Sequence, residues 1–244
     1  MISVCMTTHN SARFVKEQIE SILVQLGDDD ELIVSDDGST DETLTIIEGL
    51  HDVRIRVVHC HHDRKDLPAH EYATRNFENA LKASRGEYVF LSDHDDVWMP
   101  DKVSVTVSYL KDHPYVISDC YVTDENLNII SETRFTAEEN VHFNKYAALV
   151  LSTPYQGSCA AFRREVLEKA LPFPKGLQSH DRWIGDVAAF FFSVTIIPEK
   201  LIYYRRYEGT ASNTFGSGRA AGLLKTISYK WIYVKNILRM KIGC

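Results

Sequence analysis

Apolar runs with strand character alternate with helical periodicities along the first half of the chain. The four apolar runs lie at 2–7, 31–35, 53–58 and 86–91. Apolar residues recur every three or four positions, as in amphipathic helices, over 12–26, 39–50 and 71–84. Strands and helices that alternate at this spacing predict βαβ units and a parallel sheet. Right-handed crossovers then place successive strand ends at one edge of that sheet.

The second half of the chain continues the alternation less regularly. We expect helices at 101–112, 143–151, 163–171 and 179–191, and strands at 115–122, 195–198 and 201–207. Two of the earlier helices have capping residues at their predicted starts. Asn10 or Ser11 precedes the helix at 12–26, and residues 39–42 fit a capping box for the next one. Residues 136–140 read as a polar loop.

Three carboxylates, those of Asp93, Asp95 and Asp96, directly follow the apolar run that ends at Leu91. In open α/β sheets, ligands bind at the carboxyl ends of the strands, where these acids are predicted to lie. Neighbouring carboxylates repel one another unless a cation lies among them, and Mg²⁺ and Mn²⁺ prefer carboxylate and phosphate oxygens. A solvated acidic turn is the alternative. The apolar strand before the acids and Trp98 after them favour a binding site.

The ends of the first two predicted strands are also polar. Residues 7–9 are hydroxyl-rich, and Asp36 and Asp37 end the second strand. We expect them to face the same crevice as the three carboxylates, which makes a polar pocket suited to a nucleotide and a metal ion. Arg75 lies in the helix just before the acidic strand and is either a surface cation or a ligand contact.

Two further charged positions allow two interpretations each. Asp181 lies in the first turn of the helix at 179–191. It is either an acid favoured there by the helix dipole, worth about 0.3–1 kcal/mol, or a functional carboxylate. Arg205 and Arg206 either bind phosphate or are a pair of cations on an edge strand.

Composition limits the class of protein. The chain has 244 residues, a net charge of -7 and 44% hydrophobic residues. These values predict a globular domain that is not a general nucleic-acid binder. Its five scattered cysteines form no C-x-x-C pair and fit a reducing cytosol. We find no signal peptide and no run of about 18 apolar residues, and therefore expect a cytoplasmic location. Residues 59–63 are His-rich but too closely spaced for tetrahedral zinc, so we expect a loop.

The last segment, residues 216–244, differs in composition from the rest of the chain. It contains six Lys and Arg residues and no Asp or Glu. Its apolar residues recur at helical spacing and are Leu223, Ile227, Trp231, Val234 and Leu238. A basic amphipathic helix with aromatic residues suits an anionic membrane surface. The alternative is a C-terminal helix that packs on the domain and leaves its lysines in solvent.

Six short motifs, in this order, resemble those of the inverting glycosyltransferases of family 2, and most closely the rhamnosyltransferase-like bacterial members. They are ISVCMTTHN at 2–10, SDDGSTD at 35–41, RNFE at 75–78, DHDDVW at 93–98, LPFP at 171–174 and HDRW at 180–183. The resemblance covers about 2–213. It implies the GT-A fold, an α/β fold with a single Rossmann-like, mainly parallel sheet flanked by helices. We expect this domain at 1–215, with a nucleotide-sugar half at 1–115, an acceptor half at 116–215 and the helical tail at 216–244.

The resemblance also implies roles for individual residues. Those that fall where the family contacts the nucleotide-sugar are Thr7, His9, Asp37, Arg75 and Asp93. Asp95 matches the metal-binding position of the family's D-x-D motif, and Asp181 matches the general base. The family pattern usually ends in Tyr-Arg-Gln-His, whereas this chain has Tyr-Arg-Arg-Tyr at 204–207. Arg205 or Arg206 is therefore expected to replace the histidine as a diphosphate contact.

The function implied is metal-dependent transfer of a sugar, with inversion, from a nucleoside-diphosphate donor to a saccharide hydroxyl. A UDP-sugar is the favoured donor and dTDP-rhamnose the second. The acceptor is expected to be lipid-linked, in the synthesis of O-antigen or capsule, with the enzyme peripheral on the inner face of the membrane. Two alternatives stay open. A nucleotidyltransferase would normally carry a Gly-rich loop, which residues 7–11 lack. A non-catalytic nucleotide-sugar-binding subunit is compatible with the same motifs.

Overall fold

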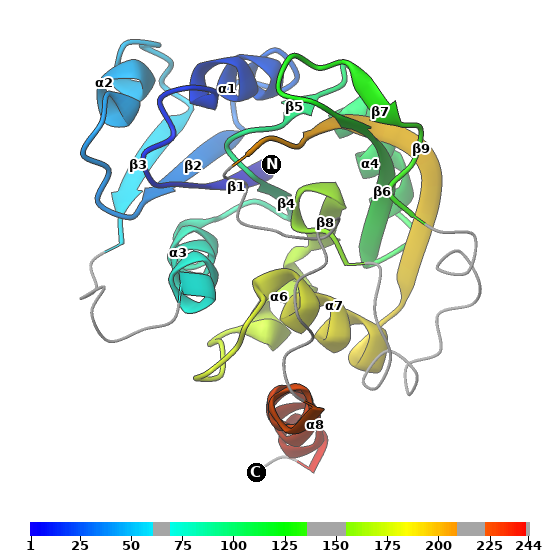
Figure 1. Cartoon of the computed structure of the whole chain (residues 1–244). Coiled ribbons are helices and arrows are strands. Elements are labelled where there is room, and N and C mark those ends of the chain that lie inside the picture. The colour runs from blue at the N-terminus through cyan, green and yellow to red at the C-terminus, as the bar shows by residue number, and fades with distance from the viewer. Residues whose placement is uncertain (61–68, 136–154, 209–222, 243–244) are drawn as a thin grey trace.

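A computed structural model describes residues 1–60, 69–135, 155–208 and 223–242 of the chain (Figure 1). The strands are β1 (Ile2–Thr8), β2 (Glu31–Asp36), β3 (Ile55–His59), β4 (Tyr88–Ser92), β5 (Val97–Trp98), β6 (Tyr115–Thr123), β7 (Ile129–Ser131), β8 (Ala160–Arg163) and β9 (Val194–Arg205). The helices are α1 (Val15–Leu23), α2 (Thr43–Glu48), α3 (Ala69–Ala83), α4 (Lys102–Leu110), α6 (Arg164–Ala170), α7 (His180–Phe191) and α8 (Leu223–Ile242), with a 3₁₀ turn at Gly157–Cys159. The predicted helix at 143–151 and loop at 136–140 lie outside the described residues.

One sheet contains all of these strands, in the order β3-β2-β1-β4-β8-β6-β9-β5, with β7 on β6. Its first four strands are parallel, as the alternating sequence pattern predicts. Their carboxyl ends lie at one edge, because Thr8 pairs with Asp36 and Met6 pairs with Ser92. In Figure 1, α1 and α2 lie on one side of the sheet, and α3, α6 and α7 on the other.

Antiparallel pairing enters in the second half of the sheet. Strand β8 pairs antiparallel with both β4 and β6 and so joins the two halves. The two closing strands predicted at 195–198 and 201–207 are one strand, β9. Pro198 lies within it, where the register against β6 shifts between Ser118 and Asp119. A register shift is a position where a strand accepts proline, because the missing N–H is not needed there.

Both helix starts predicted from capping residues differ from the structure. Helix α1 begins at Val15 and α2 at Thr43, and neither has a side-chain cap. The Ser39 hydroxyl instead donates to the Asp36 carboxylate at 2.5 Å, so the predicted capping box does not form. The backbone N–H of Thr43 donates to Asp41 at 3.0 Å. Ser39 therefore stabilises the end of β2, whereas Asp41 accepts from the first residue of α2.

The opposite, amino-terminal edge of the parallel strands has its own network. The Ser3 hydroxyl donates to Glu31 at 2.6 Å and accepts from the N–H of Gly86 at 2.6 Å. The N–H of Arg85 also donates to Glu31, at 2.7 Å. A Cβ on Gly86 would lie 2.5 Å from the Ser3 nitrogen, so only glycine allows this approach. These contacts fix the mutual register of β1, β2 and β4.

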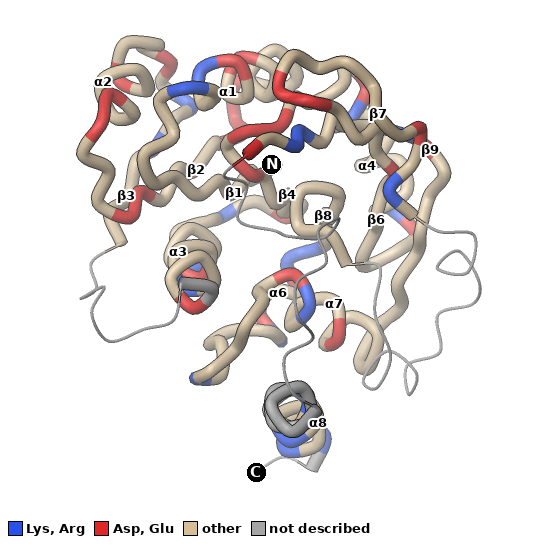
Figure 2. The backbone as a smooth tube through the Cα atoms, in the orientation of Figure 1, with Lys and Arg blue, Asp and Glu red and all other residues tan. Residues whose placement is uncertain are grey.

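Helix α8 packs against α7, where the Tyr233 and Trp183 ring centres lie 6.5 Å apart. Figure 1 shows α8 at the end of the domain that carries α6 and α7. Tyr233 is 2% exposed and Ile237 is 0% exposed. The described part of the tail is therefore a helix with one face packed on the domain. Its charged positions are basic, as Figure 2 shows. None of the helices within the described residues combines the length and hydropathy needed to cross a bilayer. The boundary predicted at residue 215 lies outside those residues.

Candidate active site

The loop between β4 and β5 presents the three carboxylates. Asp93 and Asp95 are half-buried, and Asp96 is fully buried. One oxygen of Asp96 accepts a hydrogen bond from the backbone N–H of Arg205 at 3.0 Å. Trp98, which follows in β5, is 3% exposed and packs 5.6 Å from the Phe90 ring. The loop is therefore held by β4 on one side and by β9 on the other.

These acids share one electrostatic environment with Asp181. Burial, followed by the charges of Asp95 and Asp181, raises the pKa of Asp93 to about 7. Burial also raises the pKa of Asp96 well above its ordinary value, followed by the charges of Asp95 and Asp93. Nearby like charges disfavour the ionised form. The structure thus brings Asp181, from the start of α7, to the acids that follow β4.

Thr7, His9 and Asp37 lie at the carboxyl ends of β1 and β2. A ring nitrogen of His9, Nδ1, lies 2.8 Å from the Asp37 carbonyl oxygen, and the Asp37 N–H donates to the Thr8 carbonyl at 2.9 Å. The Thr8 hydroxyl donates to Asp36 at 2.9 Å. Asp36 is therefore occupied in holding the two strand ends together, beside His9 and Asp37.

Arg75 lies on α3 with its side chain exposed. Burial, followed by the charge of Asp37, raises the pKa of the Cys60 thiol to about 11, although the charge of Arg75 lowers it. Both charges therefore act near the end of β3. The neighbouring Asn76 donates to the Thr8 carbonyl at 3.3 Å, which fixes α3 against β1. The structure places Arg75 at the same edge of the sheet as Asp37.

Asp181 takes part in the start of α7. The N-cap of this helix is Ser179, whose hydroxyl accepts from the N–H of Arg182 at 3.3 Å and donates to the Asp181 carboxylate. Asp181 also accepts from the Arg182 N–H, at 2.7 Å. A Cβ on Gly157 would lie 3.6 Å from the Asp181 Cβ and 3.1 Å from His180 Nε2. The 3₁₀ turn therefore packs against the start of α7, and its closest approach is to the His180 ring.

Arg205 ends β9 and contacts the start of α1. Its side chain is 1% exposed, donates to Glu17 at 2.6 Å and lies 4.2 Å from the centre of the Phe14 ring. Its Nε and Nη1 atoms are buried without a hydrogen-bond partner among the described residues, and the diphosphate contact expected of Arg205 stays a prediction. The guanidinium of Arg206 donates to the Tyr204 hydroxyl at 3.1 Å.

Tyr207 and Ser158 hydrogen-bond to the acids and Lys102 contacts Ser158, and none of the three was predicted as a site residue. Burial raises the pKa of Tyr207, as do the charge of Asp95 and a hydrogen bond to it. A Ser158 hydrogen bond lowers the pKa of both Asp93 and Asp96. Lys102 is 1% exposed and donates to the Ser158 carbonyl at 3.0 Å, and burial lowers its pKa to about 8. Tyr207 was detectable as the residue that replaces the family's histidine, whereas Ser158 and Lys102 carry no sequence signal.

The donor set of this loop fits a hard divalent cation. The described residues contain no group of three or more His, Cys, Asp or Glu side chains that would enclose a metal by themselves. Mg²⁺ and Mn²⁺ do not need such an enclosure, because they are usually held by one or two carboxylates together with phosphate oxygens. Asp93 and Asp95 supply oxygen donors of this kind. In the His-rich segment, His61 and His62 lie outside the described residues.

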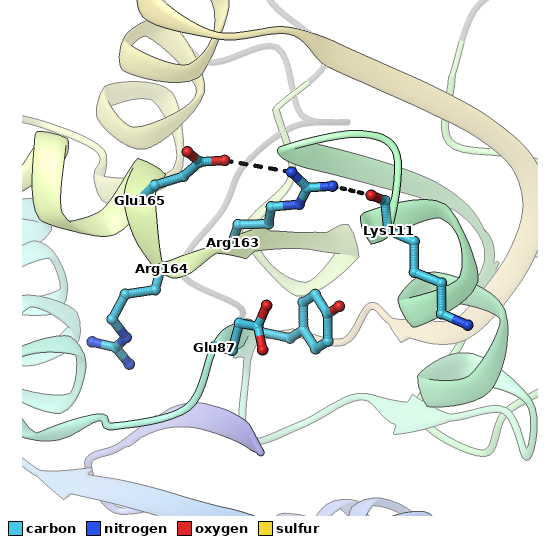
Figure 3. A pocket seen from close by; sticks show the side chains of 6 residues that line it. Glu87, Lys111, Arg163, Arg164 and Glu165 are labelled. Carbon is cyan, nitrogen blue, oxygen red and sulfur yellow. Dashed lines mark hydrogen bonds and ion pairs between the residues drawn. The ribbon is translucent and has the colours of Figure 1, made fainter.

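A surface hollow lies away from the acids. It measures about 480 Å³ and is lined by Glu87, Tyr88, Lys111, Arg163, Arg164 and Glu165 (Figure 3). It adjoins the amino end of β4, whereas the acids follow the carboxyl end. The guanidinium of Arg163 donates to the Leu110 carbonyl at 2.6 Å, and that of Arg164 to the Gly86 carbonyl at 2.7 Å. Both arginines therefore connect chain segments and are not arranged around a ligand.

A model of the family described as Glycosyl transferase family 2 matches residues 3–171. Among curated relatives, the uncharacterized glycosyltransferase alr2836 of Nostoc sp. is 30% identical over 215 residues, which are 84% of this chain and 64% of that protein. The Escherichia coli UDP-Glc:alpha-D-GlcNAc-diphosphoundecaprenol beta-1,3-glucosyltransferase WfgD is 28% identical over 151 residues, 59% of this chain and 54% of that one. The chain therefore spans less than two thirds of either relative.

Two solved structures share the fold. S. aureus TarS 1-349 in complex with UDP-GlcNAc matches with a TM-score of 0.65 and 19% identity, over 85% of this chain and 59% of that one. The mannosyltransferase PcManGT from Pyrobaculum calidifontis, in complex with GDP-Man and Mn²⁺, matches with a TM-score of 0.57 and 22% identity, over 81% of this chain and 55% of that one. The predicted GT-A fold is confirmed.

The raised pKa of Asp93 predicts a pH dependence of stability. Between the ordinary value of 3.8 and about 7, the folded protein binds more protons at this carboxyl than the unfolded chain does. Its contribution to the free energy of unfolding therefore falls as the pH rises through this range. We expect the Tm of the ligand-free protein to fall between about pH 5 and about pH 8, and Asp93→Asn to reduce that fall.

Asp29→Asn is the matched control, because Asp29 is an exposed carboxylate in the turn before β2. It should leave the pH dependence of the Tm unchanged. The measurement is differential scanning calorimetry of the three proteins in a buffer series of constant ionic strength. An equal slope for Asp93→Asn and the original protein would show that Asp93 ionises normally in the crevice.

Proposed function

The chain belongs to glycosyl transferase family 2, and on that premise we propose that it transfers a sugar from a nucleoside-diphosphate donor to a hydroxyl of a saccharide acceptor, with inversion at the anomeric carbon. One observation carries the proposal. Asp181, from the second half of the chain, acts electrostatically on Asp93 in the loop after β4. A base for the acceptor and a site for the donor diphosphate therefore lie in one crevice. A nucleotidyltransferase does not fit this family.

We assign the donor nucleoside to the ends of β1, β2 and β4 and to the facing helix α3. The residues proposed to bind it are Thr7, His9, Asp37, Arg75 and Asp93. Asp95, with the donor diphosphate, is proposed to hold Mn²⁺ or Mg²⁺. When bound, such an ion offsets the negative charge that grows on the departing diphosphate. That PcManGT was solved with Mn²⁺ supports a divalent ion in this fold.

Asp181 is the proposed general base. Its carboxylate accepts the proton of the acceptor hydroxyl while the hydroxyl oxygen attacks C1 of the donor sugar. The bond between C1 and the diphosphate oxygen breaks in the same displacement, and the nucleoside diphosphate leaves. Inversion by one displacement needs one base and no covalent intermediate. The hydrogen bonds from Ser179 and from the Arg182 N–H orient this carboxylate before the acceptor arrives.

The donor is proposed to be a UDP-sugar, with dTDP-rhamnose second, and the acceptor to be lipid-linked. WfgD is described as using UDP-Glc and a diphosphoundecaprenol-linked acceptor, and TarS was solved with UDP-GlcNAc. The reaction would belong to surface-polysaccharide synthesis. A thermal-shift screen of nucleotide-sugars with Mn²⁺ selects the donor, because a ligand that binds only the folded state raises the Tm. A donor that binds but is never turned over would favour the non-catalytic subunit.

An enzyme with a lipid-linked acceptor works at a membrane surface, and we propose that α8 docks there. Its outward face carries Trp231 and Leu238, which are 60% and 42% exposed. Three exposed cations accompany them on this helix, Lys235, Arg239 and Lys241. Each basic residue near an anionic leaflet is worth about 1 kcal/mol, and the exposed apolar groups add burial at the interface.

The first prediction tests the base. Asp181→Asn should fold and bind the donor as the original protein does, because the amide keeps an oxygen that accepts from the Arg182 N–H. Transfer should fall by about 10²–10⁴-fold, the usual contribution of a general base. Release of UDP from UDP-glucose in the presence of Mn²⁺ and a polyprenyl-diphosphate-linked GlcNAc gives the rate. Asp112→Asn, at an exposed position after α4, is the control. Equal rates for Asp181→Asn and the control would leave Asp181 as a helix-capping acid.

The second prediction tests the metal. Mn²⁺ together with UDP should raise the Tm of the original protein more than UDP alone does, and Asp95→Ala should abolish this difference. Transfer should stop in EDTA and return when Mn²⁺ or Mg²⁺ is added in excess. The Asp112→Asn control should keep the Mn²⁺ effect. Full transfer in EDTA would exclude a metal-dependent mechanism.

The third prediction tests docking. The protein should sediment with vesicles of phosphatidylcholine and phosphatidylglycerol, less so at high salt, and not with phosphatidylcholine alone. Replacing Lys235, Arg239 and Lys241 by Glu should abolish sedimentation, because the helix face then repels the anionic surface. The matched control reverses three exposed cations outside α8, at Lys16, Lys82 and Lys111. Equal sedimentation of the two triple variants would return α8 to a purely packing role.

A further inference from the structure

One side chain of α8 contacts the backbone that precedes Asp181. Tyr233 is 2% exposed, and its phenolic oxygen accepts hydrogen bonds from the N–H groups of Gln178 and Ser179, both at 3.1 Å. The same hydroxyl lies 3.4 Å from the Ser179 carbonyl oxygen, to which it donates. Three backbone groups next to the start of α7 thus share the Tyr233 hydroxyl, although the Ser179 carbonyl also accepts from the Trp183 N–H at 3.3 Å.

Ser179 transmits this anchoring to Asp181. Its hydroxyl donates to the Asp181 carboxylate and accepts from the Arg182 N–H. A shift of the Ser179 backbone therefore moves the hydroxyl that orients the carboxylate. Tyr233 also contacts the next residue, because the Arg182 guanidinium lies 4.9 Å from the centre of its ring. The segment on both sides of Asp181 therefore depends on the same aromatic residue.

We infer that Tyr233 is a positioning residue for the proposed base Asp181 and acts on it through Ser179. This inference rests on the proposed function, since it concerns the same carboxylate. It makes α8 part of the catalytic apparatus as well as a surface helix. An acceptor hydroxyl must meet the base at hydrogen-bonding distance, and a displacement of about 1 Å is enough to cost about 10²-fold in rate.

The chemistry of the phenol fits this role. Burial raises the pKa of Tyr233 to about 12, so the hydroxyl keeps its proton and its donor function at neutral pH. A phenolic oxygen can donate once and accept twice, which matches the three backbone groups around it. A purely packing role would need only the ring, whose centre lies 6.5 Å from that of Trp183. Removing the hydroxyl while keeping the ring therefore tests the positioning role separately from the packing role.

The test is Tyr233→Phe, which removes the hydroxyl and keeps the ring. We expect kcat for UDP release, with UDP-glucose, Mn²⁺ and polyprenyl-diphosphate-linked GlcNAc, to fall by about 10–100-fold. The KM for UDP-glucose should not change, because the donor contacts lie at the ends of β1, β2 and β4. Tyr109→Phe is the matched control. Tyr109 lies on α4, and its hydroxyl donates to Glu199 at 2.9 Å. Removing that hydroxyl should leave kcat unchanged.

A double variant decides whether Tyr233 acts through Asp181. If it does, Asp181→Asn combined with Tyr233→Phe should be no slower than Asp181→Asn alone, because the group to be positioned is already absent. Losses that multiply would show that Tyr233 affects the rate by another route and would overturn the inference. So would a Tyr233→Phe protein with an unchanged kcat.

A measurement without substrate keeps this test separate from the assignment of donor and acceptor. Amide hydrogen exchange at Gln178 and Ser179 should become about tenfold faster in Tyr233→Phe, as expected for the loss of a buried hydrogen bond. Exchange elsewhere in α7, and all exchange in Tyr109→Phe, should stay the same. Unchanged exchange at Gln178 and Ser179 would refute the anchoring. Exchange that accelerates as expected, together with normal transfer by Asp181→Asn, would instead refute the proposed base.

Discussion

Several carboxylates held close together at buried and half-buried positions are the constraint on which the rest of the structure depends. Asp93, Asp95, Asp96 and Asp181 act on one another, and the raised pKa values of Asp93 and Asp96 express the resulting repulsion and loss of hydration. Such an arrangement is unfavourable for the isolated protein. A cation and polar ligand groups would make this arrangement of carboxylates favourable. The energetic cost of the arrangement is therefore typical of a binding site.

The surrounding elements reduce this cost with neutral donors. The backbone N–H of Arg205 donates to Asp96, Ser158 hydrogen-bonds to the acids, and the Tyr207 hydroxyl contacts Asp95. The buried Lys102 lies 4.9 Å from the centre of the Trp98 ring, and its ammonium group donates to the Ser158 carbonyl. Full ion pairs with the acids would neutralise the crevice. Hydrogen-bond donors hold the carboxylates in place and leave their charge available to a ligand.

Sequence patterns predicted the half of the molecule that local physics determines. Regular alternation of strand and helix fixes a parallel arrangement, so the ends of β1, β2 and β4, and the acids after β4, could be placed at one edge. The antiparallel strand β8 could not, because its four residues, Ala-Ala-Phe-Arg, are too few to show a period. The capping box predicted at 39–42 does not form, because the Ser39 hydroxyl donates to the Asp36 carboxylate instead of capping α2. The contacts of Arg205 with Glu17 and Phe14 could not be predicted, because these partners lie far away in sequence.

The contacts of α8 show why the site could be predicted only in part. A helical period identified its two faces, but not which residue would reach the active site. Tyr233 reaches the start of α7 from the buried face, while Trp231 and Leu238 are exposed. Because the two faces are distinct, contact with a membrane need not disturb the hydrogen bonds that Tyr233 makes. A helix fixed on its outer face by a surface would instead restrict the motion of the inner face, and with it the motion of the Ser179 backbone. Docking and positioning would then support one another through a single rigid element.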